Sequence, residues 1–269
     1  MTLQSIAGRS VEELGGRWSV LVRQRDEHVR LNALLEDLGR TAGEAQELVL
    51  QRISRLVFPH AFAEESVLWP VLRRVLPDGD ALTLEVEREH QEVNALVTRL
   101  ERLDRADPER RQVLDRLVAV LREDVRDEED VLFPRLHAAV PARDLRRLGV
   151  AWEVVRRIAP TRAHPVVARR PPGNVIAAAP LSAIDRLRDV VDDAALRGPA
   201  GTERLLASVG AVLTGAAHAV ERLPFMRSGE DPSTRAPSAS GPGRRFAGIT
   251  AGVLAVGAVT ALLVRRRPV

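Results

Sequence analysis

Hydrophobic residues recur at helical spacing along the first half of the chain. Up to about residue 158, apolar positions follow one another at intervals of three and four residues, with few runs of β-branched residues. This 3.6-residue periodicity is typical of amphipathic helices that bury one face. We therefore expect an all-α protein in this region.

An internal repeat divides the helical region into two halves. The segment EHVRLNALLEDL, which begins at Glu27, matches EHQEVNALVTRL, which begins at Glu89. The segment PHAFAEESVLWPVL from Pro59 likewise matches EDVRDEEDVLFPRL from Glu123. Two matched segments in the same order indicate a duplicated structural unit.

The spacing within the repeat predicts the topology of the bundle. His28 and His60 are 32 residues apart, and His90 and Asp124 are 34 apart, so each half reads as helix, short loop and helix. Two such hairpins predict an antiparallel up-down-up-down four-helix bundle over residues 1–158, with one further helix packed on it.

Composition shifts divide the second half of the chain. Prolines are frequent over residues 159–180, which we interpret as a linker, and a small amphipathic helical region follows over 181–226. A helical pair of this size buries little by itself, so it packs on the bundle, on a membrane surface or on a second copy. Residues 227–245 are rich in Pro, Ser and Gly and predict a flexible linker.

Residues 246–264 form an uncharged apolar run between arginine clusters. As a helix this run would span ~28 Å, close to the hydrocarbon core of a bilayer, and it predicts a single-pass C-terminal transmembrane helix in the cell membrane. The N-terminus has no basic segment followed by an apolar run, so the N-terminal domain is expected in the cytoplasm. Gly248 and Gly252 form a GxxxG pair that would suit a homodimer.

The charged residues argue against nucleic acid as a partner. All 40 basic residues are arginines, they alternate with 37 acidic residues, and the net charge is only +3. This pattern is typical of solvated helix faces joined by ion pairs. The absence of cysteine excludes disulfides, zinc–thiolate sites and thiol catalysis, so redox chemistry would require a metal.

Polar side chains interrupt the apolar stripes of all four predicted bundle helices. They are three histidines and three carboxylates: His28, His60, Glu64, His90, Asp124 and Glu128. Unpaired carboxylates cost several kcal/mol to bury, so this set predicts a metal site. Imidazole and carboxylate ligands favour Fe, Mn or Zn, and six ligands exceed the needs of one tetrahedral zinc. A dinuclear site bridged by carboxylates fits the set.

The remaining polar candidates are expected to be secondary. Glu65 and Glu129 follow the predicted ligand glutamates by about 100° of helix rotation, which turns them to solvent or behind the ligands. His137, His164 and His218 have no repeat partner and are interpreted as structural or exposed.

With these motifs, roughly residues 15–140 resemble the hemerythrin-like family, also called the HHE cation-binding domain. The family pattern is a His, then HxxxE, and then both again. Here it is met by His28, by His60 with Glu64, and by His90, whereas the last motif is DxxxE. Asp124 stands where a histidine is usual, so it ligates directly, through water or not at all.

The resemblance implies a non-haem di-iron centre, with Mn or Zn as less favoured metals. Its ligand would be a diatomic molecule or peroxide, and the function would be binding or sensing of O2, NO, peroxide or iron by a membrane-tethered protein. The alternatives are a peroxidase-like, catalase-like or O2-activating enzyme, and a metal-stabilised scaffold that recruits a partner at the membrane. The sequence leaves open whether the protein is an enzyme.

Overall fold

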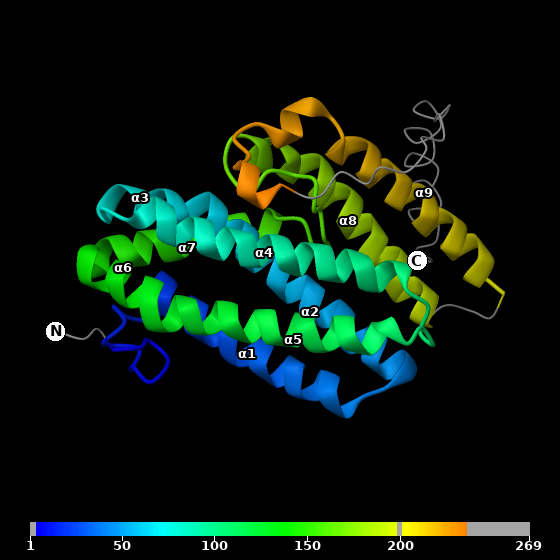
Figure 1. Cartoon of the computed structure of the whole chain (residues 1–269), viewed down its shortest axis with the longest axis horizontal. Coiled ribbons are helices and arrows are strands. Elements are labelled where there is room, and N and C mark those ends of the chain that lie inside the picture. The colour runs from blue at the N-terminus through cyan, green and yellow to red at the C-terminus, as the bar shows by residue number, and fades with distance from the viewer. Residues whose placement is uncertain (1–3, 198–200, 236–269) are drawn as a thin grey trace, which may run out of the picture.

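The described part of the chain is built from helices. A computed structural model describes residues 4–197 and 201–235, and no β-strand occurs in those ranges. Four long helices run antiparallel to one another as a bundle (Figure 1). They are α1 (Val20–Arg40), α2 (Gly43–Ala63), α4 (Gly79–Arg102) and α5 (Glu109–Asp127). The predicted all-α bundle is confirmed.

Two of the bundle helices continue through a π-helical turn. Helix α2 passes through η1 (Glu64–Leu68) into α3 (Trp69–Val75). Helix α5 passes in the same way through η2 (Glu128–Leu132) into α6 (Phe133–Ala139). The repeat therefore reproduces the same distortion in both hairpins.

Prolines explain the position of these π turns. Pro70 and Pro134 are the second residues of α3 and α6, and a proline ring clashes with the carbonyl four residues earlier in a regular α-helix. The wider turn relieves this clash, and the N–H of Trp69 donates to the carbonyl of Glu64, five residues back. Pro59, by contrast, lies inside α2, which continues to Ala63.

The apolar core is split into two clusters along the bundle axis. One cluster contains Leu21, Trp69 and Phe133 and is closed by helix α7 (Ala142–Ile158). The other cluster contains Leu35 and Leu117 and fills the opposite end of the bundle. The polar positions singled out in the sequence lie between the two clusters.

Helix α7 packs closely on α1 and α2. Gly149 permits this approach, because a Cβ atom at this position would lie 2.0 Å from the carbonyl oxygen of Trp18. The indole of Trp152, on the same helix, is buried and meets the imidazole of His60 edge-on, with ring centroids 5.6 Å apart. Helix α7 thus covers one side of the polar layer.

The C-terminal helical pair packs on the bundle. Helices α8 (Gly173–Arg197) and α9 (Glu203–Glu221) form a hairpin. Helix α8 begins earlier than the predicted 181, because Pro180 lies inside the helix and does not end a linker. Of the three packing partners left open by the sequence, the bundle is the one observed, since Arg55 of α2 contacts Asp189 of α8 at 3.2 Å.

Residues after α9 also pack on the protein as far as they are described. Two 3-10 turns, η3 (Pro224–Arg227) and η4 (Pro232–Thr234), follow the hairpin. The N–H of Ala168 donates to the carbonyl of Met226 at 3.0 Å, which ties η3 to the segment before α8. The N–H of Gly173 donates to the carbonyl of Ser228 at 2.9 Å, and Thr234 is 3% exposed. The predicted flexible linker over 227–245 is therefore packed on the protein in its described part, and its remainder lies outside the described residues.

The predicted transmembrane anchor is not supported. Within the residues that the structure describes, no helix combines the length and the apolar character that a membrane crossing requires. The anchor was predicted for residues 246–264, which lie outside the described ranges. Length and hydropathy of one apolar run are insufficient to establish a spanning helix, so the anchor and the cell-membrane location that depended on it are withdrawn.

A buried histidine fixes the segment between α7 and α8. His164 is 5% exposed, and its Nδ1 and Nε2 atoms lie 2.8 Å from Glu221 and 3.0 Å from Asp185. Its backbone N–H donates to the side-chain oxygen of Asn94 on α4 at 2.9 Å. Burial opposes protonation, but the hydrogen bonds to Asp185 and Glu221 prevail and raise the pKa of His164 to about 9. A charged imidazolium thus joins α8 and α9 to the bundle.

Replacing His164 by Gln should lower the free energy of unfolding by about 3 kcal/mol at neutral pH, because two buried carboxylates lose their cation. The folded pKa lies above the ordinary value, so the stabilisation is complete below pH 6.5 and is lost as the pH rises through about 9. Urea denaturation followed by circular dichroism at pH 6, 7.5 and 9.5 measures the difference. His218→Gln, an exposed histidine of α9, is the control; a deficit in His164→Gln that is the same at all three pH values would contradict the assignment.

Candidate metal centre

Every helix of the bundle contributes to one buried polar layer. Side chains from α1, α2, η1, α4, α5 and η2 meet there, and each residue is 8% exposed or less. They are His28, His60, Glu64, His90, Asp124 and Glu128. The structure therefore brings together all six residues that the sequence analysis singled out as ligands.

The six side chains form two groups that share a glutamate. In the first group, ligand atoms of His28, His60, Glu64 and Glu128 lie within 4.8 Å of one another. In the second group, ligand atoms of His90, Asp124 and Glu128 do the same. Each group has the dimensions of a site that could hold one metal ion.

The two glutamates lie between the groups. The Oε1 atom of Glu64 is 3.0 Å from the Nε2 atom of His60, and its Oε2 atom is 3.6 Å from the Nε2 atom of His90. The Oε2 atom of Glu128 is 3.2 Å from the Nε2 atom of His28. Both carboxylates can therefore bridge two ions.

Unsatisfied polar atoms show that this layer suits a cation. Both carboxylate oxygens of Glu64 and Glu128 are buried without a hydrogen-bond partner among the described residues, as are Nε2 of His90 and Oδ1 of Asp124. Buried polar atoms normally have partners, so a cluster of orphaned acceptors facing one another is costly. A metal ion with a preference for nitrogen and oxygen ligands would satisfy them together.

A second carboxylate stands behind each histidine. The Nδ1 atoms of the three imidazoles lie 2.9 to 3.0 Å from carboxylate oxygens. The pairs are His28 with Glu129, His60 with Glu27, and His90 with Glu65. This arrangement places the proton on Nδ1 and leaves Nε2 free to ligate a metal.

The π turns explain why Glu65 and Glu129 point inward. In an α-helix a residue that follows a ligand is rotated by about 100°. The turns η1 and η2 begin at the ligand glutamates, and a π turn contains more residues, so each residue rotates by less. The sequence left open whether Glu65 and Glu129 turn to solvent or lie behind the predicted ligands. The structure places both behind the histidines.

Glu27 is a residue of this layer that the sequence analysis missed. It is 5% exposed, and its Oε1 atom is also 3.2 Å from Arg156 of α7. A signal for it was present, because both repeats begin with the same Glu-His pair. The corresponding residue of the second repeat is Glu89. The position equivalent to His60 is Asp124, which offers a carboxylate and no imidazole.

The metal-free layer retains protons. Burial opposes protonation of His28, but the adjacent carboxylates of Glu128 and Glu129 raise its pKa to about 9. Burial likewise opposes protonation of His90, yet Asp124 and Glu65 raise its pKa to about 10. The pKa of Asp124 is raised to about 7 by burial and by the neighbouring Glu128. A metal ion would have to displace these protons.

A small cavity adjoins the layer. Its volume is about 10 Å³, and its walls combine the imidazoles of His28, His60 and His90 with apolar side chains such as Leu56 and Val125. This volume is close to the minimum that one water molecule needs. The space beside the metal positions is therefore suited only to very small ligands.

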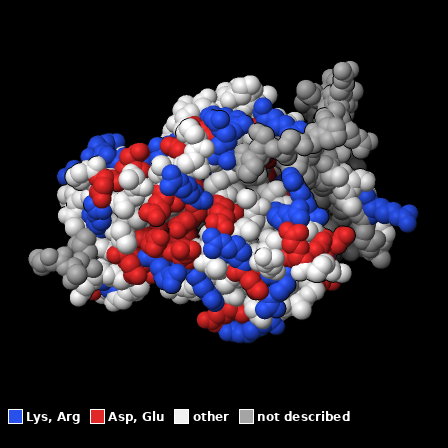
Figure 2. Space-filling model, viewed as in Figure 1, with Lys and Arg blue, Asp and Glu red and all other residues white. Residues whose placement is uncertain are grey.

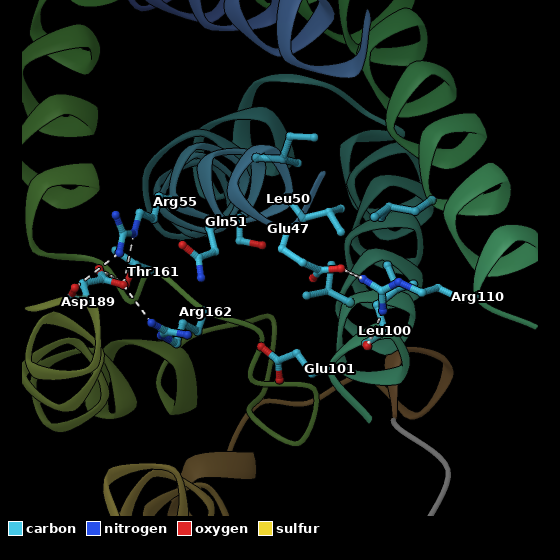
Figure 3. A pocket seen from close by; sticks show the side chains of 14 residues that line it. Glu47, Leu50, Gln51, Arg55, Leu100, Glu101, Arg110, Thr161, Arg162 and Asp189 are labelled. Atoms are coloured by element: carbon cyan, nitrogen blue, oxygen red, sulfur yellow. Dashed lines mark hydrogen bonds and ion pairs between the residues drawn. The ribbon is translucent and has the colours of Figure 1, made fainter. Parts of the chain in front are cut away.

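A larger cavity lies elsewhere and belongs to no ligand group. It measures about 180 Å³ and lies where α2, α4 and α5 face the segment before α8 (Figure 3). Arginines on its rim are already paired, Arg55 with Asp189 and Arg110 with Glu47. His137, which contacts Arg9 at 3.1 Å, and His218, which is exposed, also lie outside the groups.

Comparison with known proteins shows which family part of this chain resembles. Residues 20–136 match the hemerythrin family, described as the hemerythrin HHE cation binding domain. An uncharacterized hemerythrin-like protein of Schizosaccharomyces pombe is 24% identical over 134 residues, which is 49% of this chain and 66%, just under two thirds, of the relative. No solved structure matches the chain. Residues 20–136, which carry the repeat and all six polar positions of the layer, are therefore the part of the chain that is similar to the hemerythrin HHE cation-binding family.

Proposed function

We propose that the bundle binds two iron ions between its hairpins and uses them to bind or sense O2, NO or peroxide. The observation that carries the proposal is the set of orphaned ligand atoms, contributed by equivalent positions of both repeats and buried in one layer. The cation-binding description of the family agrees with it.

The ligand groups support one division of the residues between two ions. One ion would be held by His28 and His60, the other by His90 and Asp124, with Glu64 and Glu128 bridging. Iron bound in this way supplies open coordination positions and electrons to a small molecule.

The protein surroundings define what the site admits. Carboxylates behind the histidines hold the imidazole rings in place. Phe133 stacks on His28 and Trp69 on His90, with centroids 6.1 and 6.4 Å apart, and both aromatic residues are fully buried. These rings exclude water from one side of the layer, and the adjoining cavity of about 10 Å³ limits ligands to a few atoms.

The purified chain should contain about two iron ions and show a visible charge-transfer band that changes with O2 or NO. His60→Ala and Glu64→Gln should each lose at least one ion, since both remove first-group ligands. Metal analysis with visible spectroscopy measures both quantities, and His137→Ala, outside the groups, is the control. Iron content in His60→Ala equal to that of the unchanged protein would contradict the proposal, and repeated turnover of peroxide that is lost in this variant would favour an enzyme.

Iron affinity should rise between pH 6 and pH 9. The pKa values of His28 and His90 are raised to about 9 and 10 in the metal-free protein, so protons compete with the metal throughout this range. Binding must release these protons, and raising the pH removes the competitor. Competition titrations against a chelator of known pH dependence measure how the iron affinity changes with pH. An iron affinity that does not depend on pH would show that the histidines are not ligands.

Glu129→Gln should weaken metal binding by about 10- to 100-fold without unfolding the bundle, because an amide holds the His28 imidazole less firmly than a carboxylate. Chelator competition measures the affinity, and circular dichroism verifies the fold. Glu109→Gln provides a control, since this exposed carboxylate pairs with Arg99 and lies outside the polar layer. Equal affinities of the two variants would argue against a supporting role for Glu129.

A further inference from the structure

Many ion pairs of this protein lie at its surface. Figure 2 shows arginine and acidic side chains next to one another over much of the visible face. In pairs such as Arg40 with Glu36, at 2.7 Å, both partners are exposed. Exposed pairs of this kind contribute little to stability. One arginine differs from them, because it reaches a buried carboxylate that stands behind a predicted metal ligand.

That arginine is Arg156 of α7. Its Nη1 atom lies 3.2 Å from Oε1 of Glu27, and Oε2 of the same carboxylate lies 3.0 Å from Nδ1 of His60. Glu27 therefore offers one oxygen to the guanidinium and the other to the imidazole. A carboxylate that is held at both oxygens has a fixed orientation, and it fixes the imidazole ring in turn.

An aromatic ring completes this support. The indole of Trp152 is 1% exposed, and its edge meets the imidazole of His60 with ring centroids 5.6 Å apart. The guanidinium carbon of Arg156 lies 5.4 Å from the centroid of the same indole. Trp152 and Arg156 are four residues apart and therefore share one face of α7. This face contacts His60 directly through Trp152 and indirectly through Glu27.

Contacts on both sides of α7 fix the helix in this position. At Gly149 its backbone lies so close to α1 that a Cβ atom would be 2.0 Å from the carbonyl oxygen of Trp18. Glu153 pairs with Arg156 at 3.1 Å and with Arg23 of α1 at 2.8 Å. The guanidinium of Arg156 is therefore anchored by its own helix as well as by Glu27.

The second repeat lacks this support. Glu89 is the equivalent of Glu27, and Asp124 is the equivalent of His60. Within the described ranges no arginine forms an ion pair with Glu89, and its Oε2 atom is buried without a hydrogen-bond partner. The support therefore serves the first ligand group, and it comes from a helix beyond residues 20–136, the part of the chain that is similar to the family.

We infer that Arg156 is a positioning residue for the first metal position: through Glu27, and with Trp152 beside it, it holds the imidazole of His60 in the orientation in which Nε2 can ligate. The inference rests on the proposed metal-binding function and extends the centre to α7. Loss of this arginine should weaken one of the two metal positions and leave the other unchanged.

The test uses the full chain, stripped of metal and titrated with Co²⁺, a paramagnetic ion that accepts the same nitrogen and oxygen ligands. Arg156→Gln should bind one of the two Co²⁺ ions about tenfold more weakly, at the lower end of the effect of residues that support a ligand, because it acts one contact further away. The shifted Nδ1–H resonance of one ligated histidine should also exchange faster with solvent. Chelator competition measures the affinity, and proton nuclear magnetic resonance measures the exchange.

Arg157→Gln is the matched control. It removes the same charge from the next position of α7, where Arg157 pairs with Glu153 at 2.7 Å and is 73% exposed, and it should bind both ions as the unchanged protein does. Arg156→Lys should regain most of the affinity, because it keeps a cation beside Glu27. If Arg156→Gln does not fold, Arg156→Met replaces it, since methionine keeps an apolar stem against Trp152 without the charge.

A double-mutant cycle with Glu27→Gln tests the route of the effect. If Arg156 acts through Glu27, its replacement should change the Co²⁺ affinity little in the Glu27→Gln background. A loss of the same size in both backgrounds would overturn the inference.

The outcomes separate this inference from the proposed function. An unchanged protein that binds two Co²⁺ ions, with the same affinities and the same exchange rates in Arg156→Gln, would overturn the positioning role and leave the proposed function intact. An unchanged protein that binds no Co²⁺ would contradict the metal centre itself, and the positioning role with it.

Discussion

The burial of carboxylates and imidazoles in one layer is the constraint on which the rest of the structure depends. Each imidazole requires a carboxylate behind it, and two of those carboxylates have a cation of their own. Glu27 contacts Arg156 of α7 at 3.2 Å, and Glu65 lies 3.8 Å from Arg169 in the segment before α8. Because a buried charge needs a partner, the elements outside the bundle extend the network that begins at the ligands.

This network makes the two halves of a duplicated bundle unequal. The half that contains His60 is covered by α7, with Trp152 against the imidazole ring. The half that contains His90 is covered by the segment before α8, where Arg169 lies 3.8 Å from Glu65. Duplicated sequence thus supplies the ligand positions, whereas unique sequence decides how each half is enclosed.

The burial of the six polar positions in one layer could be predicted from the sequence because two independent regularities coincide on them, the repeat and the 3.6-residue apolar period. The sequence did not predict the role of Glu27, since a residue beside a ligand has no distinctive spacing. The inward orientation of Glu65 depends on a π turn, which periodicity cannot reveal. The predicted start of α8 was too late, because Pro180 was interpreted as the end of a linker but lies within the helix. The apolar run at 246–264 was interpreted from its length, its composition and the flanking arginines, and none of these fixes where such a run packs.

The division of the apolar core has a consequence for how the domain unfolds. The two clusters share the bundle helices but meet only across the polar layer, so each end has its own set of packed side chains. Without a metal, that layer offers imidazole–carboxylate pairs where a continuous core would offer apolar contact. The two ends are then coupled only through these polar pairs and the helix backbones, and the metal-free domain should open as two units at different denaturant concentrations. Occupancy of the centre would join them into one folding unit.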